Sequence, residues 1–347
     1  MRAEDVLVPT PAGLWSPAAR VHVDPVRPVE RALITHGHSD HARAGHGAVL
    51  ATADTLAIMA ARCGAGFAGT VQAIGYGESL RIGDAAVTFV PAGHCLGSAQ
   101  IALEAGGLRV VVSGDYKRER DPTCRPFEPV RCDVFVTEAT FGLPVFRFPP
   151  AAGEIARLLG SLALFPDRTH MLGAYSLGKA QRLVALLREA GYDRPIHLHG
   201  AMVALCRLYE ERGVPLGPLA PVEGRAGATL PGEIVLCPPT ALGDRWSRRF
   251  ADPVSSFASG WMRVRARARQ RGVELPLVVS DHADWEDLCT TVAETGAAEV
   301  WVTHGEEDAL VHWCLTNGIA ARPLRLVGYG DEEEGTEVVA GSGEPPG

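Results

Sequence analysis

Four side chains that can bind a metal ion are crowded into six consecutive positions of the segment ALITHGHSDHARAGH. An apolar stretch, which predicts a strand, runs directly into His36, His38, Asp40 and His41. Side chains of an extended chain alternate with a period of two, so His36 and His38 can bind one ion. Asp40 and His41 follow where the chain turns, and we expect them to face a second ion. A purely structural role explains this crowding poorly.

Further candidate ligands follow three other apolar stretches, each of which predicts a strand. His94 follows AVTFVPAG, Asp115 follows VVVSG, and His304 follows EVWVT. The simplest assignment gives one ion His36, His38 and His94, gives the second ion Asp40, His41 and His304, and makes Asp115 the bridge. A set of nitrogen and oxygen ligands without a thiolate suits Zn²⁺, with Mn²⁺ as the alternative.

The pattern of apolar residues changes along the chain. Residues 1–150 contain short predicted strands at 21–23, 31–35, 86–91, 99–104, 108–113 and 133–137. Helices predicted at 153–164, 178–190 and 200–212 then alternate with strands at 169–173 and 196–200, which is typical of a parallel α/β unit. After Pro276 we predict a strand at 276–281, a helix at 284–295, a strand at 299–304, a helix at 305–317 and a strand near 322–327.

Composition limits the class of protein. The 347 residues, 46% of them hydrophobic, suffice for one large domain or two ordinary ones. No apolar run reaches the roughly 18 residues of a membrane-spanning helix, and we expect a cytoplasmic protein without a membrane partner. The net charge of −8 argues against nucleic-acid binding through bulk charge. Much of that charge, however, lies in a Gly-rich acidic tail at 329–347, which we expect to be disordered.

Four of these segments resemble the metal motifs of a known fold. HGHSDH, PAGHCLGS, SGDYK and VTHGE are similar to the successive metal motifs of the metallo-β-lactamase fold. The resemblance implies an α/β protein in which two β-sheets are sandwiched between helices, the αββα arrangement. It also implies that Asp24, in VHVDP, is the acidic residue that orients ligands or water in this fold.

The distance between two ligands indicates an insertion. Asp115 and His304 are 189 positions apart, more than a strand and a connecting helix require. In between, Glu138 in VTEATFG and His282 in VVSDHADW, followed by His304, resemble the three signature motifs of β-CASP nucleases, which cut RNA or DNA. The expected division is a metallo-β-lactamase domain at 1–150 and 276–328, an inserted β-CASP-like α/β domain at 151–275, and the tail.

A narrower resemblance concerns the substrate. PAGLWSP, TEATFGLPVFR, GAYSLGKAQRL and FASGWMRVRARARQRG are similar to bacterial DNA-ligase-associated exonucleases. This likeness implies DNA as substrate, and an ATP-dependent DNA ligase and a helicase as partners in DNA repair. Three alternatives remain: a ribonuclease of the same mechanism, a small-molecule hydrolase such as a lactonase or thioesterase, and a non-catalytic nucleic-acid-binding scaffold. The long insertion disfavours the second, and the full ligand set disfavours the third.

The expected chemistry assigns roles to the remaining residues. Two cations about 3.5 to 4 Å apart activate a shared water and bind the oxygens of a phosphate, but the leaving oxygen still needs a proton. His282 is the candidate general acid, and Glu138 is expected to hold its imidazolium. Asp24 and Asp40 are candidates for ordering the attacking hydroxide. A structural histidine at a helix start is the alternative for His282.

Two segments are candidates for substrate binding. GAYSLGK follows the Walker A pattern up to Lys179, but Ala180 replaces the Ser or Thr that an NTPase needs. A glycine-bounded loop before a helix can bind phosphate, here with Ser176, Lys179 and Arg182. In WMRVRARARQR, arginines occupy every second position. On a strand, Arg263, Arg265 and the rest would line one face for a nucleic-acid backbone; on a helix they would scatter. A solvated arginine-rich surface is the alternative.

Overall fold

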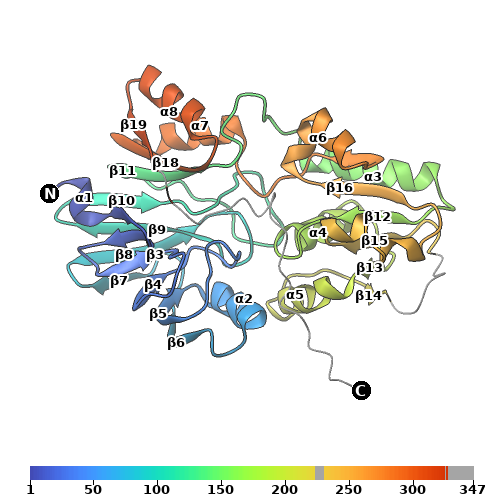
Figure 1. Cartoon of the computed structure of the whole chain (residues 1–347), viewed down its shortest axis with the longest axis horizontal. Helices are drawn as coiled ribbons and strands as arrows, with labels where there is room; N and C mark the ends of the chain where they lie inside the picture. Colours follow the sequence, from blue (N-terminus) through green and yellow to red (C-terminus); the bar gives the residue numbers. More distant parts are fainter. Residues whose placement is uncertain (223–229, 325, 327–347) are drawn as a thin grey trace.

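The computed structural model describes residues 1–222, 230–324 and 326. The expected acidic tail at 329–347 lies outside these residues. Two lobes lie side by side (Figure 1). We call the lobe that holds both ends of the described chain the sandwich lobe, and the lobe built from residues 151–277 the inserted lobe. None of the helices described is both long and apolar enough to cross a membrane.

The sandwich lobe contains two stacked sheets. Within the described residues the first sheet has the order β1-β2-β3-β4-β5-β6 and the second has the order β19-β18-β11-β10-β9-β8-β7. Leu33, Val87 and Val110 belong to the apolar core between them. The first sheet comprises β1 (Val8–Thr10), β2 (Gly13–Ser16), β3 (Val21–Val23), β4 (Arg31–Leu33), β5 (His46–Ala51) and β6 (Ala68–Ala73). The second comprises β7 (Ser79–Ile82), β8 (Ala85–Pro91), β9 (Ala99–Ala105), β10 (Leu108–Val112), β11 (Val134–Ala139), β18 (Glu299–Gly305) and β19 (Ala320–Pro323).

Helices cover the outer faces of the two sheets. α2 (Ala53–Cys63) packs Met59 against the outer face of the first sheet. α7 (Trp285–Thr295) and α8 (Glu307–Thr316) pack Leu288 and Leu310 against the second. The short α1 (Ala3–Val6) lies at one end. Figure 1 shows α7 and α8 at the top of the left lobe, and α2 packs against the other sheet, so the order helix, sheet, sheet, helix confirms the expected αββα sandwich.

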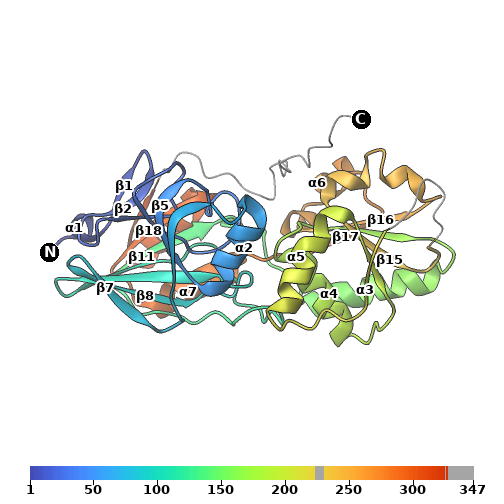
Figure 2. The same ribbon diagram turned by 90° about the horizontal axis from the view of Figure 1, so that it is seen from below.

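The inserted lobe contains a parallel sheet, in line with the expected α/β insertion. Its order is β14-β13-β15-β12-β16-β17, and every pairing among the described residues is parallel. Its strands are β12 (His170–Gly173), β13 (Ile196–Leu198), β14 (Leu219–Pro221), β15 (Ile234–Cys237), β16 (Val254–Ala258) and β17 (Leu275–Leu277). α3 (Ala151–Leu164), α4 (Lys179–Glu189) and α5 (Gly200–Glu211) pack against one face. On the other lie η1 (Pro239–Leu242), η2 (Ser247–Arg249), η3 (Gly260–Arg263) and α6 (Arg265–Gln270), as Figure 2 shows for α6.

Two local predictions differ from the structure. The strand expected at 276–281 to open the return into the sandwich is β17, which starts at Leu275 and still pairs with β16 of the inserted sheet. The boundary placed at residue 276 therefore falls inside a strand. The arginine stretch is also not a strand, because Trp261 and Met262 turn inward at η3 and α6 follows. The prediction of one strand face lined by guanidinium groups is wrong.

The carboxyl ends of strands from both lobes meet in the middle of the molecule. β3 and β4 are parallel neighbours, and β10, β11 and β18 also run parallel. In the inserted sheet, the loop that follows β12 reaches the sandwich, where the backbone oxygen of Leu177 contacts His38. The carboxyl edge of the inserted sheet therefore faces the carboxyl ends of the sandwich strands, the edge at which open α/β sheets bind ligands.

Candidate metal centre

The predicted metal ligands all follow or end strands at this edge of the sandwich. His36, His38, Asp40 and His41 follow β4, and His94 follows β8. Asp115 follows β10, and His304 is the second-last residue of β18. The pairing of β11 and β18 shifts register at His304. Glu138 pairs with Thr303 and the next residue, Ala139, pairs with Gly305, so His304 has no partner in this ladder. His304 is thus the extra residue of a bulge, with φ of 59°, a conformation often kept at functional sites.

Four of these side chains form one compact group. The ligand atoms of His36, His38, His94 and Asp115 lie within 4.8 Å of one another, and all four residues are buried. The Asp115 carboxylate is 3.3 Å from Nε2 of His36, 3.5 Å from Nε2 of His41 and 3.8 Å from Nε2 of His94. Asp115 therefore lies between the two predicted ligand sets, as a bridging carboxylate must.

Two backbone carbonyls set the orientation of His38 and His94. Nε2 of His38 is 3.2 Å from the Leu177 oxygen, and Nδ1 of His94 is 2.8 Å from the Asp281 oxygen. A carbonyl only accepts hydrogen bonds, so these nitrogens carry the protons. The other two nitrogens, Nδ1 of His38 and Nε2 of His94, then face each other 2.9 Å apart with lone pairs. A cation bound by both nitrogens would remove this repulsion.

The second ligand set is organised by Asp24. Its carboxylate accepts hydrogen bonds from the backbone N–H and the hydroxyl of Thr35, at 2.8 and 2.6 Å, and lies 2.8 Å from Nδ1 of His41. Nε2 of His41 is left facing Asp40, at 3.4 Å. His36, Asp40 and His41 form a second group of potential ligands, and the rings of His41 and His304 lie 5.3 Å apart.

Electrostatics favour the metal-binding forms of these residues. Burial lowers the pKa of His36 and of His304 to about 4, and the neighbouring His41 adds to both effects. Burial, with His36 and His38, holds the pKa of His94 well below its usual range. Burial alone would raise the pKa of Asp115, but His41 and His36 keep it well below the usual range. Neutral imidazoles around a carboxylate are the form that divalent metals bind, and His36, His94 and His304 are held in that form. His41 differs: burial alone would lower its pKa, but Asp40 and Asp115 raise it well above the usual range, so His41 must release a proton to bind a metal ion.

The centre therefore fits metal ions. Nε2 of His36 is buried and makes no hydrogen bond to any described atom, so it is available as a ligand. The remaining donors are imidazole nitrogens and carboxylate oxygens at short mutual distances. Such a set is typical of a divalent metal site whose histidines are oriented by hydrogen bonds from their other ring nitrogens, as those of His38, His94 and His41 are here.

A histidine and a glutamate lie directly beside this centre. Nδ1 of His282 is 2.9 Å from Oε2 of Glu138, whose other oxygen accepts the backbone N–H of Tyr116 at 2.7 Å. Ligand atoms of Asp115, Glu138 and His282 also lie within 4.8 Å of one another, and the rings of His282 and His94 are 4.9 Å apart. Burial raises the pKa of Glu138, while His282 opposes this rise. The pair has the geometry of a histidine oriented by a carboxylate.

The predicted phosphate-binding side chains of the GAYSLGK loop are buried. Ser176, Lys179 and Arg182 are 3%, 1% and 0% exposed. Lys179 lies 3.5 Å from the Asp281 carboxylate, and Arg182 donates to the Ser280 oxygen. These contacts leave no accessible cation for a phosphate, so direct substrate binding by the three side chains is not supported by this arrangement. The loop instead contacts a predicted metal ligand, His38.

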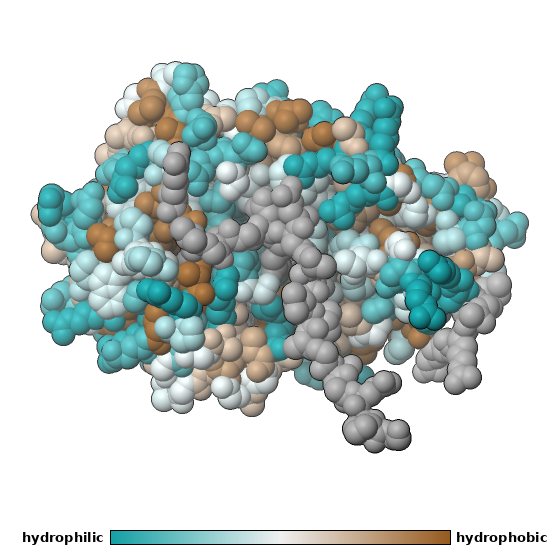
Figure 3. All heavy atoms as spheres, in the orientation of Figure 1, coloured by the Kyte–Doolittle hydropathy of each residue, from teal (hydrophilic) through white to brown (hydrophobic). Residues whose placement is uncertain are grey.

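The arginines at 245–271 lie in a different environment. This segment has eight arginines and one acidic residue, Asp252, in a chain of net charge −8. Arg263 and Arg265 are exposed, and neither has a carboxylate partner among the described residues. Arg267 stacks on Trp261 at 3.7 Å. We call residues 245–249 and 263–271 the basic edge, because they follow β15 and β16 at the carboxyl edge. Hydrophilic residues gather over α6 in Figure 3.

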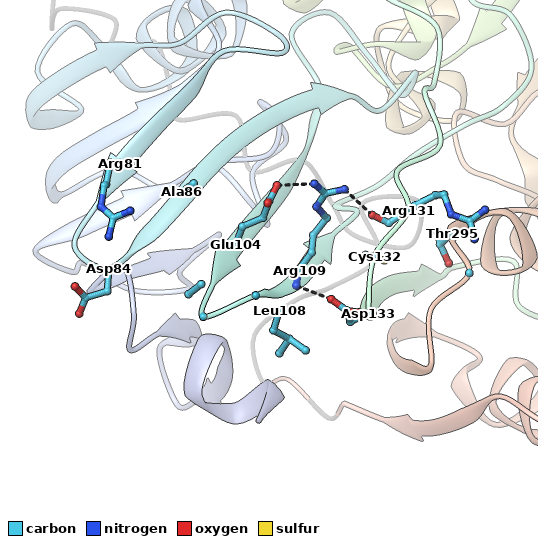
Figure 4. Close-up of a pocket in the computed structure, with 14 residues that line it drawn as sticks. Arg81, Asp84, Ala86, Glu104, Leu108, Arg109, Arg131, Cys132, Asp133 and Thr295 are labelled. Atoms are coloured by element: carbon cyan, nitrogen blue, oxygen red, sulfur yellow. Dashed lines mark hydrogen bonds and ion pairs between the residues drawn. The ribbon is translucent and has the colours of Figure 1, made fainter. Parts of the chain in front are cut away.

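The opposite edge of the second sheet carries a separate cavity. It has a volume of about 590 Å³ and is lined by Arg81, Arg109 and Arg131 together with Glu104 and Asp133. Arg109 is ion-paired with Glu104 at 2.9 Å (Figure 4). Because the cavity adjoins the turn between β9 and β10, it lies away from the carboxyl ends that carry the metal ligands.

Several residues that organise the centre were missed by sequence analysis. Thr35 holds Asp24 and also lies 3.0 Å from Nδ1 of His36. Asp281 and Leu177 act through backbone oxygens, which have no residue-type signature. A signal for Asp281 existed, because it directly precedes His282 in the motif SDHAD.

Comparisons with known proteins agree with the fold. No family model matches the chain. A protein of Opitutus terrae named "Probable DNA ligase" is 33% identical over 300 residues, which are 84% of this chain and 28% of that protein. The endoribonuclease ysh1 of Aspergillus fumigatus is 32% identical over 130 residues, 36% of this chain and 15% of that protein. The chain thus spans less than a third of either relative.

A solved structure shows the same fold. It is a protein of unknown function from Enterococcus faecalis, with a TM-score of 0.56 and 15% identity, covering 85% of this chain and 79% of that chain. The αββα sandwich with histidines and carboxylates at one edge defines the class as the metallo-β-lactamase fold. Within it, the chain belongs to the β-CASP branch, a family of metal-dependent nucleases.

Proposed function

We propose that the protein is a two-metal phosphodiester hydrolase that acts as a DNA exonuclease in DNA repair. The observation that carries this proposal is the His282–Glu138 pair, 2.9 Å apart, beside the group His36, His38, His94 and Asp115. A hydrolase for phosphodiesters needs both parts: ligands for divalent ions and a proton donor for the leaving oxygen.

The residues of the metal centre have separate roles in the proposed reaction. His36, His38 and His94 would hold one ion and Asp40, His41 and His304 the other, with Asp115 between them. When bound, two divalent ions, Zn²⁺ or alternatively Mn²⁺, activate water and bind the oxygens of the scissile phosphate. Asp24 keeps the ring of His41 oriented through Nδ1. We assign Asp40 and Asp24 to ordering the attacking water.

His282 supplies the proton. Its Nδ1 donates to Glu138, so a protonated ring presents Nε2–H to the leaving oxygen, and Glu138 stabilises the positive charge of that ring. The N–H of Tyr116 fixes the other oxygen of Glu138, which keeps the carboxylate in place. This arrangement is a general acid oriented by a carboxylate.

The basic edge supports a nucleic-acid substrate. Exposed arginines attract a phosphate backbone, and Arg263 and Arg265 are exposed and have no carboxylate partner among the described residues. We assign Arg263 and Arg265 to this contact. The choice of DNA, and of a DNA ligase as partner, is supported by the Opitutus terrae relative, whose name is that of a ligase. A helicase partner and a cytoplasmic location rest on the likeness to DNA-ligase-associated exonucleases.

A ribonuclease is the second candidate, because the Aspergillus fumigatus relative is named an endoribonuclease. Single-stranded DNA and RNA of one sequence, each labelled at the 5′ or the 3′ end, would separate the two functions. Stepwise shortening of DNA supports the exonuclease. Cleavage of RNA alone, or internal cuts in DNA, would contradict it.

The role of His282 has its own test. His282→Ala should lower turnover about 10² to 10⁴-fold, because the leaving oxygen loses its proton donor. The metal content, measured by elemental analysis, should stay that of the unsubstituted protein. A loss of bound metal in this variant would make His282 a ligand and would remove it as general acid.

A further inference from the structure

The chain contains only two lysines, Lys117 and Lys179, and both are buried beside the same carboxylate. Nζ of Lys117 is 4.0 Å and Nζ of Lys179 is 3.5 Å from Asp281. Lysine is almost never fully buried unless it is paired. We call Lys117, Asp121, Lys179, Arg182 and Asp281 the buried ion cluster; each is at most 5% exposed.

The buried ion cluster joins three segments of the chain. Lys117 and Asp121, paired at 2.7 Å, lie in the loop that follows Asp115. Lys179 and Arg182 belong to the first turn of α4 in the inserted lobe. Asp281 lies in the connection by which the chain returns to the sandwich, and Arg182 contacts it at 3.4 Å.

The same segments carry the two carbonyls that orient predicted metal ligands. Leu177, whose oxygen contacts His38, lies two residues before Lys179. Asp281 contacts His94 through its backbone oxygen and Lys179 through its side chain. Gly178 allows the close approach: it has φ of 78°, and a Cβ at this position would lie 3.2 Å from the Cβ of Cys95. The ion pair between Lys179 and Asp281 therefore fixes both carbonyls relative to each other.

We propose that the buried ion cluster is a positioning device for the metal centre. Its ion pairs hold the Leu177 and Asp281 oxygens, and these oxygens hold His38 and His94 with the ring nitrogens that bind metal turned inward. Lys179, Arg182 and Asp281 are thus positioning residues. This inference rests on the metal centre of the proposed function but needs neither its substrate nor its reaction.

The energetics favour positioning over stabilisation as the reason for this cluster. Replacing a buried ion pair by apolar side chains is often neutral or stabilising, because burial of charges costs solvation. A cluster of five buried charged residues is therefore a poor way to stabilise an interface. Residues that orient metal ligands, in contrast, typically contribute 10- to 100-fold to metal affinity.

The test compares variants of the cluster with a variant of the neighbouring core. Asp281→Asn keeps the backbone carbonyl and removes the charge, and Lys179→Met removes the other partner. Leu158→Ala, in the buried core of the inserted lobe, is the control that loses stability without touching the cluster. Affinity is measured with Zn²⁺ by chelator competition, and ligand geometry from the visible absorption spectrum of the Co²⁺-loaded protein.

We expect Asp281→Asn and Lys179→Met to bind one of the two Zn²⁺ ions about 10- to 100-fold more weakly and to change the Co²⁺ spectrum. Lys179→Arg, which keeps the charge, should bind within about threefold of the original protein. Leu158→Ala should keep both affinity and spectrum. If Asp281→Asn and Lys179→Met behave like Leu158→Ala, the cluster only stabilises the fold and the proposal is wrong.

If the variants fail to fold, a measurement on the unsubstituted protein still tests the proposal. Because the chain has only two lysines, acylation by an amine-reactive ester, followed by mass spectrometry, reports directly on the cluster. A buried lysine reacts only when its surroundings open, and a bound ion stabilises the closed arrangement, so Zn²⁺ should slow the modification of Lys179 about tenfold or more relative to the metal-free protein. Equal rates would overturn the proposal. Neither measurement uses nucleic acid, so an absence of nuclease activity would refute the proposed function alone.

Discussion

Two groups of cationic side chains in this molecule have opposite surroundings. In the buried ion cluster, Lys117, Lys179 and Arg182 all face carboxylates and are at most 2% exposed. In the basic edge, Arg263 and Arg265 are exposed and have no carboxylate partner among the described residues. Lys179 and Arg182 of the first group and Arg263 and Arg265 of the second were expected to bind phosphate, and the structure leaves only the second pair accessible.

The difference shows that residue type alone does not tell whether a lysine or arginine side chain binds phosphate. A buried cation is stable only if it is paired, and the pairing that makes burial possible also removes it from the substrate. An exposed, unpaired guanidinium keeps its five donors for a phosphate. Burial and pairing therefore decide which cations serve the fold and which serve binding.

The largest expected difference between the two groups is in stability. Lys179→Met leaves Asp281 buried with one partner fewer, and we expect a loss of about 3 to 5 kcal/mol in the free energy of unfolding. Arg265→Ala removes an exposed, unpaired side chain and should change it by less than about 0.5 kcal/mol. Urea unfolding of the metal-free proteins measures both. Similar losses of unfolding free energy in the two variants would contradict the contrast between the buried ion cluster and the basic edge.

The second expected difference is the pH dependence of the cluster. Burial alone would raise the pKa of Asp281, but Lys179, Lys117 and Arg182 lower it from 3.8 to about 2. The ionised carboxylate therefore contributes about 2 kcal/mol of stability above pH 4, and this contribution is lost as the pH falls toward 2. The stability difference between the unsubstituted protein and Asp281→Asn should shrink by about 1 kcal/mol from pH 5 to pH 3.

The control for this pH effect is Leu158→Ala, which changes no titratable group. Its stability loss should be the same at pH 5 and pH 3 in the metal-free protein. If the stability difference between the unsubstituted protein and Asp281→Asn does not shrink over this range, the three cations do not stabilise the ionised Asp281. Asp281 would then not belong to the buried ion cluster.

Sequence patterns predicted the parts of the molecule that depend on local order. Short apolar strands followed by His36, His94 or Asp115 indicated the sandwich, and the structure brings these side chains together at one edge. The αββα fold with an inserted α/β lobe was predicted correctly. The ligand residues could be named because metal binding demands particular residue types at strand ends.

Other features could not be predicted, for physical reasons. Alternation in WMRVRARARQR fits a strand, but the burial of Trp261 and Met262 against Phe141 and Phe146 turns the chain there into η3. The roles of Leu177 and Asp281 depend on backbone oxygens and on residues more than 100 positions away, such as Lys179 for Asp281. Such contacts exist only after the lobes have packed together.

The smallest expected effect concerns the basic edge. If Arg263 and Arg265 each contact one phosphate, the paired variant Arg263→Ala/Arg265→Ala should reduce the dependence of log affinity on log salt by about 1.4 for a single strand. We expect affinity to fall on the order of fivefold, about 1 kcal/mol. Binding of a labelled oligonucleotide in excess chelator, at several salt concentrations, measures this without cleavage.

The matched control for the basic edge is Arg81→Ala/Arg131→Ala. These two exposed arginines line the cavity at the opposite edge of the second sheet and have no carboxylate partner among the described residues. The control removes the same net charge, so it separates contact with the strand from long-range attraction. Equal salt slopes for the two double variants would mean that the basic edge attracts nucleic acid only through overall charge and does not touch the backbone.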